Sequence, residues 1–155
     1  MSAADNKALV LSWLQAGPSS DAGRSMLSHD FRWHIPKGMA ELMNAGSSVV
    51  HGPDALLELS AIDKAVYAGG ETTFDMVYVI AEGDWVALQA NIGARSHEGD
   101  EYSNTYVFSF RCEDGLIAEV WENADTKYWC DTIIGRPEQL DGVKRRLAAL
   151  RTSRR

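Results

Sequence analysis

The stretch GDEYSNTYVFSFRCEDGLIAEVWENADT, residues 99–126, determines which fold the chain can adopt. Apolar and polar residues alternate with a period of two through 102–112 and again through 116–124. This alternation is typical of β-strands with one buried face. The sequence Glu113-Asp114-Gly115 between the two segments predicts a tight turn. The two segments are therefore expected to pair as an antiparallel hairpin.

The same period continues toward the N-terminus. Residues 73–80 and 85–95 predict two further strands, with turn sequences at 82–84 and 97–100. Four strands joined by short glycine-containing turns predict an antiparallel meander.

Helical signals dominate the first part of the chain. Ser2 can cap a first helix, residues 17–21 (GPSSD) can end it and cap a second, and Gly52-Pro53-Asp54 opens a third. A short strand at 31–35 precedes Pro36, and residues 36–52 are interpreted as a loop or lid. This order predicts an α+β fold: a cone of N-terminal helices packed on a strongly curved antiparallel sheet.

Size and composition indicate one domain. The chain has 155 residues, 45% hydrophobic and 24% charged, which suits a single domain over 1–155 with a core at about 4–133. Six of the 15 basic residues lie in the last 12, within a basic C-terminal helix or tail at about 136–155. The rest of the chain holds the other nine basic residues and all 22 acidic ones, so it is strongly acidic. Nucleic acid is therefore not expected as a partner.

No membrane association is expected, because no apolar run approaches the ~20 residues needed to cross a bilayer. The chain shows no secretory signal, and two cysteines are too few for a disulfide scaffold. These observations favour a cytoplasmic protein with reduced thiols.

Polar residues inside apolar strands are the candidates for chemistry. His34 lies in a short strand and is either a general acid or base or a packed histidine that binds a backbone carbonyl. Glu122 shares a strand face with Ala118, Val120 and Ala124 and is either a buried carboxylate with a raised pKa or an exposed glutamate. Asp125 more simply caps the following helix. A one-residue error in register would exchange Glu122 for its neighbours.

A second group is aromatic. Asn104, Tyr106 and Phe108 share one strand face, where the two polar groups either bind a ligand oxygen or belong to an aromatic core. Trp13 and Trp33 either line the mouth of a pocket or are plain core. The four histidines lack the spacing of a metal motif, and no nucleophile-elbow serine, phosphate loop or dinucleotide fingerprint is present. No metal is therefore expected.

Residues 99–126 resemble the SnoaL-like, ketosteroid-isomerase-like branch of the nuclear-transport-factor-2-like superfamily. The matching features are Asn104-x-Tyr106, the pair Phe108 and Phe110, Asp114-Gly115 and Glu122-x-x-Asp125-Thr126. Residues 30–36 and 52–56 also fit the family, and the resemblance covers about residues 4–133. It implies the cone-shaped fold, a homodimer formed through the sheet, a small-molecule ligand and the absence of a cofactor.

The resemblance also implies candidate chemistry. Members include isomerases, dehydratases, cyclases and epoxide hydrolases. Glu122 occupies the position of one hydrolase aspartate, but Ala90 and Ile92 stand where that mechanism needs an arginine and a second aspartate. The resemblance pairs His34 with Glu122 as acid and base in proton transfer on a small apolar or cyclic carbonyl compound. The alternatives are a non-catalytic ligand-binding protein and a structural dimer module.

Overall fold

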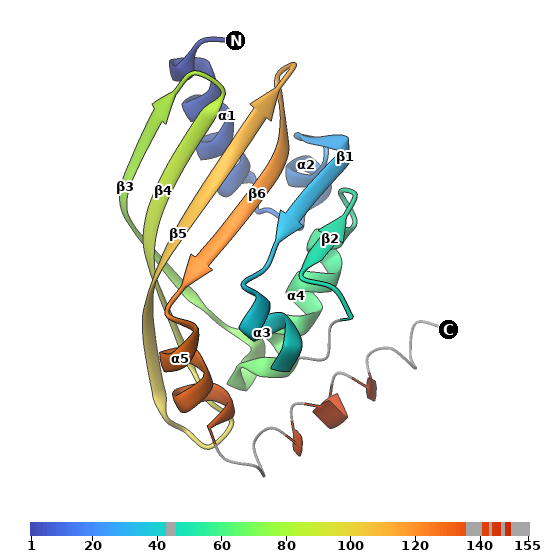
Figure 1. The fold of residues 1–155 in the computed structure, drawn as a ribbon, viewed down its shortest axis with the longest axis vertical. Helices are drawn as coiled ribbons and strands as arrows, with labels where there is room; N and C mark the ends of the chain where they lie inside the picture. Colours follow the sequence, from blue (N-terminus) through green and yellow to red (C-terminus); the bar gives the residue numbers. More distant parts are fainter. Residues whose placement is uncertain (43–45, 136–140, 143, 147, 150–155) are drawn as a thin grey trace.

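One bent sheet with helices on one side organises the molecule (Figure 1). The computed structural model describes residues 1–42, 46–135, 141–142, 144–146 and 148–149. Its elements are α1 (Ala3–Ala16), α2 (Asp21–Arg24), β1 (Leu27–His34), α3 (Lys37–Leu42), β2 (Val49–His51), α4 (Ala55–Val66), a 3₁₀ turn (Ala68–Gly70), β3 (Thr73–Glu82), β4 (Trp85–Arg95), β5 (Glu101–Glu113), β6 (Leu116–Ala124), α5 (Thr126–Trp129) and a π turn (Cys130–Ile134). The predicted α+β fold is confirmed.

The sheet has the order β2-β1-β6-β5-β4-β3. The predicted meander forms β3 to β6, with every neighbouring pair antiparallel. β1 pairs in parallel with β6, and β2 pairs antiparallel with β1 at the edge. None of the described helices is long and apolar enough to cross a membrane. The predicted basic tail falls largely outside the described residues.

Helix α1 begins directly after Ser2, which is its N-cap as the sequence predicted. The Ser2 hydroxyl accepts a hydrogen bond from the backbone N–H of Asp5, and the Asp5 carboxylate accepts one from that of Ser2. The buried side chain of Asn6 donates to the carbonyl of Gly83 at 2.9 Å and ties the helix to the β3–β4 turn. Val10 and Trp13, one and two turns further along, are then buried against the sheet.

The turn between β5 and β6 has the backbone conformation that its sequence, Asp114-Gly115, predicted. Asp114 and Gly115 have φ values of 50° and 82°. Positive φ at both central residues defines the hairpin turn that matches the right-handed twist of the strands, and aspartate followed by glycine is a favoured pair there.

β6 contains a bulge that alternation alone does not predict. Arg111 lies opposite Glu119, whereas Cys112 lies opposite Ile117, so Ala118 is the extra residue. Ile117 and Val120 consequently both face the core, while Ala118 borders a hollow on the outer face. The expectation that Ala118 shares a face with Val120 and Glu122 was therefore wrong, although Val120 and Glu122 do lie on the inner face.

Residues 36–52 are more ordered than a simple loop. They contain α3, whose Met39 and Ala40 are buried, and β2, which pairs with β1 through Arg32, Trp33 and His34. Residues 43–45 lie outside the described chain. Among the described residues of this segment, none lines the main cavity, so the lid interpretation gains no support from their geometry.

Candidate active site

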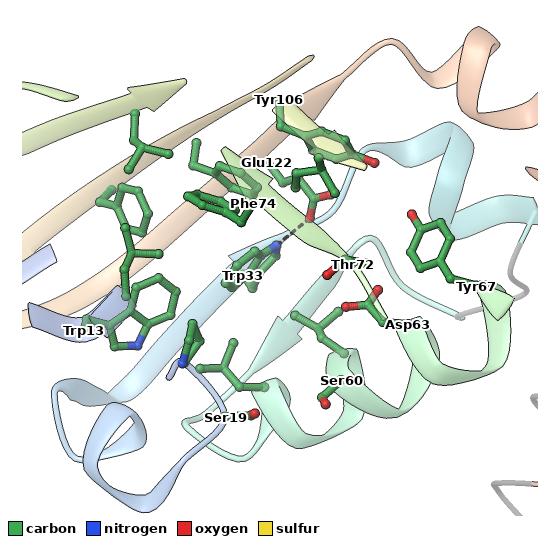
Figure 2. Close-up of a pocket in the computed structure, with 18 residues that line it drawn as sticks. Trp13, Ser19, Trp33, Ser60, Asp63, Tyr67, Thr72, Phe74, Tyr106 and Glu122 are labelled. Atoms are coloured by element: carbon green, nitrogen blue, oxygen red, sulfur yellow. Dashed lines mark hydrogen bonds between the residues drawn. The ribbon is translucent and has the colours of Figure 1, made fainter. Parts of the chain in front are cut away.

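A cavity of about 470 Å³ lies between the inner face of the sheet and the helices (Figure 2). Its volume is in the range of small-molecule sites. α1, β1, α4 and all four meander strands contribute to its wall. The lining residues are Trp13, Leu14, Pro18, Ser19, Trp33, Leu56, Leu59, Ser60, Asp63, Tyr67, Thr72, Phe74, Leu88, Ile92, Tyr106, Phe108, Phe110 and Glu122.

Glu122 projects from β6 into this aromatic cavity. Its Oε2 accepts a hydrogen bond of 2.9 Å from the indole N–H of Trp33, drawn as the dashed line in Figure 2. Burial raises the pKa of the Glu122 carboxyl to about 7, against the opposing effect of the Trp33 hydrogen bond, and the negative charge of Asp63 adds to the rise. A carboxyl with this pKa exchanges protons readily near neutral pH.

Asp63 is a second carboxyl in the same cavity. It projects from α4 on the face that also carries Ser60 (Figure 2), and Leu59 of the same helix lines the cavity as well. The Asp63 residue keeps exposed surface, but the surrounding protein removes much of the hydration of its carboxyl and raises its pKa to about 6. Because each carboxylate disfavours ionisation of the other, the two are expected to titrate as a coupled pair.

Three tyrosine hydroxyls form a polar cluster beside these carboxyls. The Asn104 amide donates to the Tyr102 hydroxyl at 2.8 Å, and the Tyr102 and Tyr106 hydroxyls are also 2.8 Å apart. The indole N–H of Trp129 donates to the Tyr67 hydroxyl at 3.0 Å. The hydrogen bond between the Tyr102 and Tyr106 hydroxyls can run in either direction. When Tyr102 donates, the Tyr106 proton is available to a ligand.

Burial keeps these hydroxyls protonated. It raises the pKa of Tyr106 and of Tyr67 far above the ordinary value, and it raises that of Tyr102 to about 12. Tyr106 and Tyr67 both line the cavity, so it has hydroxyl donors beside its two carboxyls (Figure 2).

Five of the seven candidates from the sequence line this one cavity: Trp13, Trp33, Tyr106, Phe108 and Glu122. The indoles of Trp13 and Trp33 lie 6.3 Å apart, and Phe108 packs edge-on against Trp33 at 6.0 Å. Their contact with substrate stays a prediction.

Asn104 lies on the predicted face but does not line the cavity. It is buried, and its amide donates to the Tyr102 hydroxyl and to the backbone carbonyl of Asp125. Asn104 therefore positions the Tyr102 hydroxyl without lining the cavity itself. Asp125 caps α5 as expected, accepting from the N–H of Tyr128.

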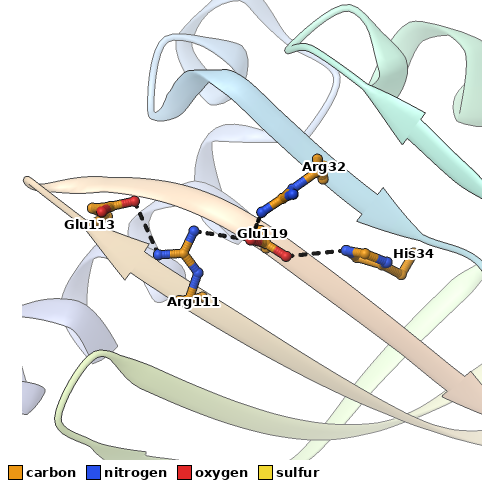
Figure 3. Close-up of polar contacts among 5 residues, drawn as sticks. All are labelled: Arg32, His34, Arg111, Glu113 and Glu119. Carbon is orange, nitrogen blue, oxygen red and sulfur yellow. Dashed lines mark hydrogen bonds and ion pairs between the residues drawn. The ribbon is translucent and has the colours of Figure 1, made fainter.

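The structure does not bring His34 and Glu122 together. His34 lies on the outer face of the sheet, stacked on Trp121 with ring centroids 4.5 Å apart, and its Nε2 is 3.2 Å from Glu119 (Figure 3). The reason is strand alternation: Trp33 points into the cavity, so the next residue of β1 must point away from it. The expected acid–base pair of His34 and Glu122 is therefore not formed.

The outer partner of His34 has different electrostatics. Glu119 forms ion pairs with Arg32 and with Arg111, the latter at 3.0 Å, and Arg111 also binds Glu113 (Figure 3). Burial opposes ionisation of Glu119, but the hydrogen bonds from Arg111, His34 and Arg32 outweigh it and hold its pKa below the ordinary value. β6 thus carries Glu119 on its outer face, paired with arginines, and Glu122 on its inner face, where none of the described lining residues of the cavity has a cationic side chain.

Asp63 was not among the sequence candidates, although a signal exists. Leu56, Leu59, Ser60 and Asp63 follow the helical spacing of one face. An aspartate that continues the apolar face of a helix is a candidate for a buried or cavity-lining acid.

The chain belongs to the SnoaL-like domain family, whose match spans residues 14–120. The resemblance seen in residues 99–126 is thereby confirmed. No curated protein matches the chain.

Solved structures share the fold. TerC, co-crystallised with polyporic acid, is 20% identical with a TM-score of 0.73, and the match covers 84% of this chain and 98% of TerC. An NTF2-like protein of unknown function from Burkholderia pseudomallei K96243 is 18% identical with a TM-score of 0.71, covering 83% and 97%. A protein from Jannaschia sp. CCS1, assigned as a SnoaL-like polyketide cyclase, is 18% identical with a TM-score of 0.68, covering 86% and 94%.

Proposed function

We propose that this SnoaL-like protein is a cofactor-independent isomerase, dehydratase or cyclase that transfers a proton on a small apolar or cyclic carbonyl compound. The observation that carries the proposal is Glu122, an uncompensated carboxyl inside an aromatic cavity with a pKa of about 7. In this role Glu122 removes a proton from the carbon next to the substrate carbonyl and returns it to the substrate.

The neighbours of Glu122 support this role. In the proposed reaction the Trp33 N–H, which is hydrogen-bonded to Glu122, orients the carboxylate, and the Tyr106 hydroxyl, which lines the same cavity, donates to the oxyanion that develops on the carbonyl. Trp13 and Phe108 supply apolar wall for the substrate skeleton. An open cavity of about 470 Å³ argues against the alternative of a purely structural module whose pocket is filled by its own aromatic side chains.

Hydrogen–deuterium exchange tests the proposal without knowledge of the product. The purified protein is incubated in D₂O with a panel of cyclic ketones and enones, and exchange at the α-carbon is followed by NMR. Exchange well above the buffer rate is expected for compounds that fit the cavity. Ligands that bind without any accelerated exchange would instead identify a binding protein.

Replacing Asp63 with asparagine is expected to move the acidic limb of the pH–rate profile to lower pH. Glu122 must be ionised to act as a base, so activity rises with pH through its pKa, and the charge of Asp63 raises that pKa. Removing this charge lowers the pKa, which increases the fraction of activity retained below neutral pH. The measurement is the pH dependence of kcat/KM for exchange.

Glu58→Gln is the matched control for this experiment, because Glu58 is an exposed carboxylate of α4 outside the cavity. It is expected to leave the limb in place. A limb that is unmoved in Asp63→Asn, or moved to higher pH, would contradict the coupling.

We also propose that two copies associate through the outer face of the sheet. Tyr78, Ile80 and Trp85 are 41%, 61% and 47% exposed. Tyr78 pairs with Gln89 and Ile80 with Ala87, which places them on the face opposite the cavity. Trp85 meets Trp121 there, with ring centroids 5.2 Å apart. A contiguous exposed apolar surface of this kind is typical of a protein interface.

The variant Ile80→Glu is expected to convert a dimer into a monomer, because it would bury two unpaired carboxylates at the interface. Analytical ultracentrifugation at micromolar concentration measures the change. Tyr128→Glu, at an exposed aromatic residue of α5, is expected to remain dimeric. A wild-type protein that is already monomeric would refute the proposed interface.

A further inference from the structure

The cavity has an unusual charge inventory. Its only carboxyls are Asp63 and Glu122, and no lysine, arginine or histidine is among its 18 described lining residues. The remaining polar side-chain groups among these residues are neutral: hydroxyls and the indole N–H groups of Trp13 and Trp33. A ligand with a negative charge would therefore find two acidic groups and no positive partner.

In the described part of the chain, Asp63 lacks the hydrogen-bond and ion-pair partners that Glu122 and Glu119 have. Within the described residues, no hydrogen bond or ion pair to its side chain is formed, and desolvation is what raises its pKa. Glu122 has the Trp33 N–H, and Glu119 on the outer face has Arg32, Arg111 and His34. The chain thus supplies cations to its outer carboxylate and leaves Asp63, which faces the cavity, without one (Figures 2 and 3).

Aromatic rings surround the same space. Phe74 and Phe108 have ring centroids 6.4 Å apart, and Phe108 lies edge-on to Trp33 at 6.0 Å. Trp13 and Phe110 extend this wall, also in an edge-on pair, at 5.7 Å. The faces of such rings carry negative partial charge and attract cations, most strongly where water is excluded.

We propose that the cavity is selective for hydrophobic amines, with the protonated nitrogen of the ligand paired with Asp63 and its carbon skeleton packed against the aromatic wall. The inference rests on the proposed function and specifies its substrate: a cyclic or aromatic carbonyl compound that carries a basic nitrogen. Asp63 then anchors the substrate, while Glu122 is left to move the proton. The ligand thus supplies the positive charge that the described residues of the cavity lining lack.

A matched series of bicyclic ligands tests the selectivity. The probes are 2-aminoindane, 2-indanol and indane-2-carboxylate, which share one skeleton and differ in the charge of one substituent. Isothermal titration calorimetry at neutral pH measures each affinity for the unmodified protein. The amine is expected to bind about tenfold more tightly than the alcohol, and the carboxylate more weakly than both.

Two variants assign the preference to Asp63. Asp63→Asn is expected to remove the advantage of the amine while leaving the affinity for 2-indanol within a few-fold. Glu58→Gln, on the same helix but outside the cavity, is expected to keep the full preference. An alcohol that binds as tightly as the amine, an amine that does not bind at millimolar concentration, or a preference that survives Asp63→Asn would overturn the proposal.

Failure of this inference is distinguishable from failure of the proposed function. Amine preference is an equilibrium affinity, whereas proton transfer is measured by deuterium exchange. Exchange on neutral ketones without amine preference would overturn the substrate class alone. Amine preference without exchange on any amino ketone would overturn the catalytic proposal and leave an amine-binding protein.

Discussion

Replacing Glu122 with glutamine is expected to slow α-proton exchange on a cavity-bound ketone by roughly 10²–10⁴-fold. Glutamine keeps the shape of the side chain and a group that can face the Trp33 N–H, but it cannot accept a proton at neutral pH. The loss should appear in kcat, because in the proposed reaction the carboxylate acts on the reacting proton, while the aromatic walls of the cavity are unchanged by the substitution. NMR exchange rates at saturating ketone measure the effect.

His34→Asn is the informative control for this variant. His34 lies outside the cavity against Trp121 and Glu119, so exchange is expected to remain within a few-fold of the wild-type rate. The opposite pattern, with exchange lost in His34→Asn and retained in Glu122→Gln, would refute the assignment of the base. Circular dichroism confirms that both variants remain folded before their rates are compared.

Tyr106→Phe has the second largest expected effect, a decrease in kcat of roughly 10²–10³-fold. The variant removes the hydroxyl that we propose donates to the developing oxyanion but keeps the aromatic ring that packs against Phe108. Substrate affinity should change less than the rate, because an oxyanion accepts a hydrogen bond more strongly than the ground-state carbonyl does. Steady-state exchange kinetics separate kcat from KM.

Tyr78→Phe provides the matched comparison, since Tyr78 belongs to the outer face of the sheet. It is expected to leave both parameters unchanged. If Tyr106→Phe raises KM and leaves kcat intact, the hydroxyl binds the substrate uniformly and does not stabilise the oxyanion.

The sequence predicted the meander well because each of its features is local. Period-two alternation depends on neighbours within one strand, and the Asp114-Gly115 turn depends on the φ values that two adjacent residues can adopt. The inward face of β5, with Tyr102, Asn104, Tyr106 and Phe108, could be identified from this alternation alone. The N-terminal cap at Ser2 was predictable for the same reason.

The site was only partly predictable because its assembly is not local. Trp33 and Glu122 meet through the parallel pairing of β1 with β6, and nothing in either segment specifies that partner. Asp63 approaches from a helix separated from Glu122 by the first three strands of the meander and most of the fourth. Such encounters depend on how the helices pack on the curved sheet.

One error could have been avoided from the sequence. Trp33 and His34 are adjacent in a strand, so only one of them can face the cavity. Assigning both to the pocket was inconsistent with the geometry of β1. The structure resolves the choice in favour of Trp33 and gives His34 an outer contact with Trp121.

The bulge at Ala118 makes the chemistry of the cavity depend on the length of β6 as well as on its composition. Because the bulge already holds one extra residue, the loss of one residue from this stretch would restore plain alternation with Glu122 still facing inward. Gaining one residue between the bulge and Glu122 would instead turn that carboxyl outward and bring a neighbouring residue inward. A substitution in this segment changes one side chain and leaves the pairing register of β6 as it is. A single-codon insertion would exchange the inner and outer surfaces beyond it, so this stretch is expected to evolve by replacement or by loss of the bulge, and not by gain of a residue.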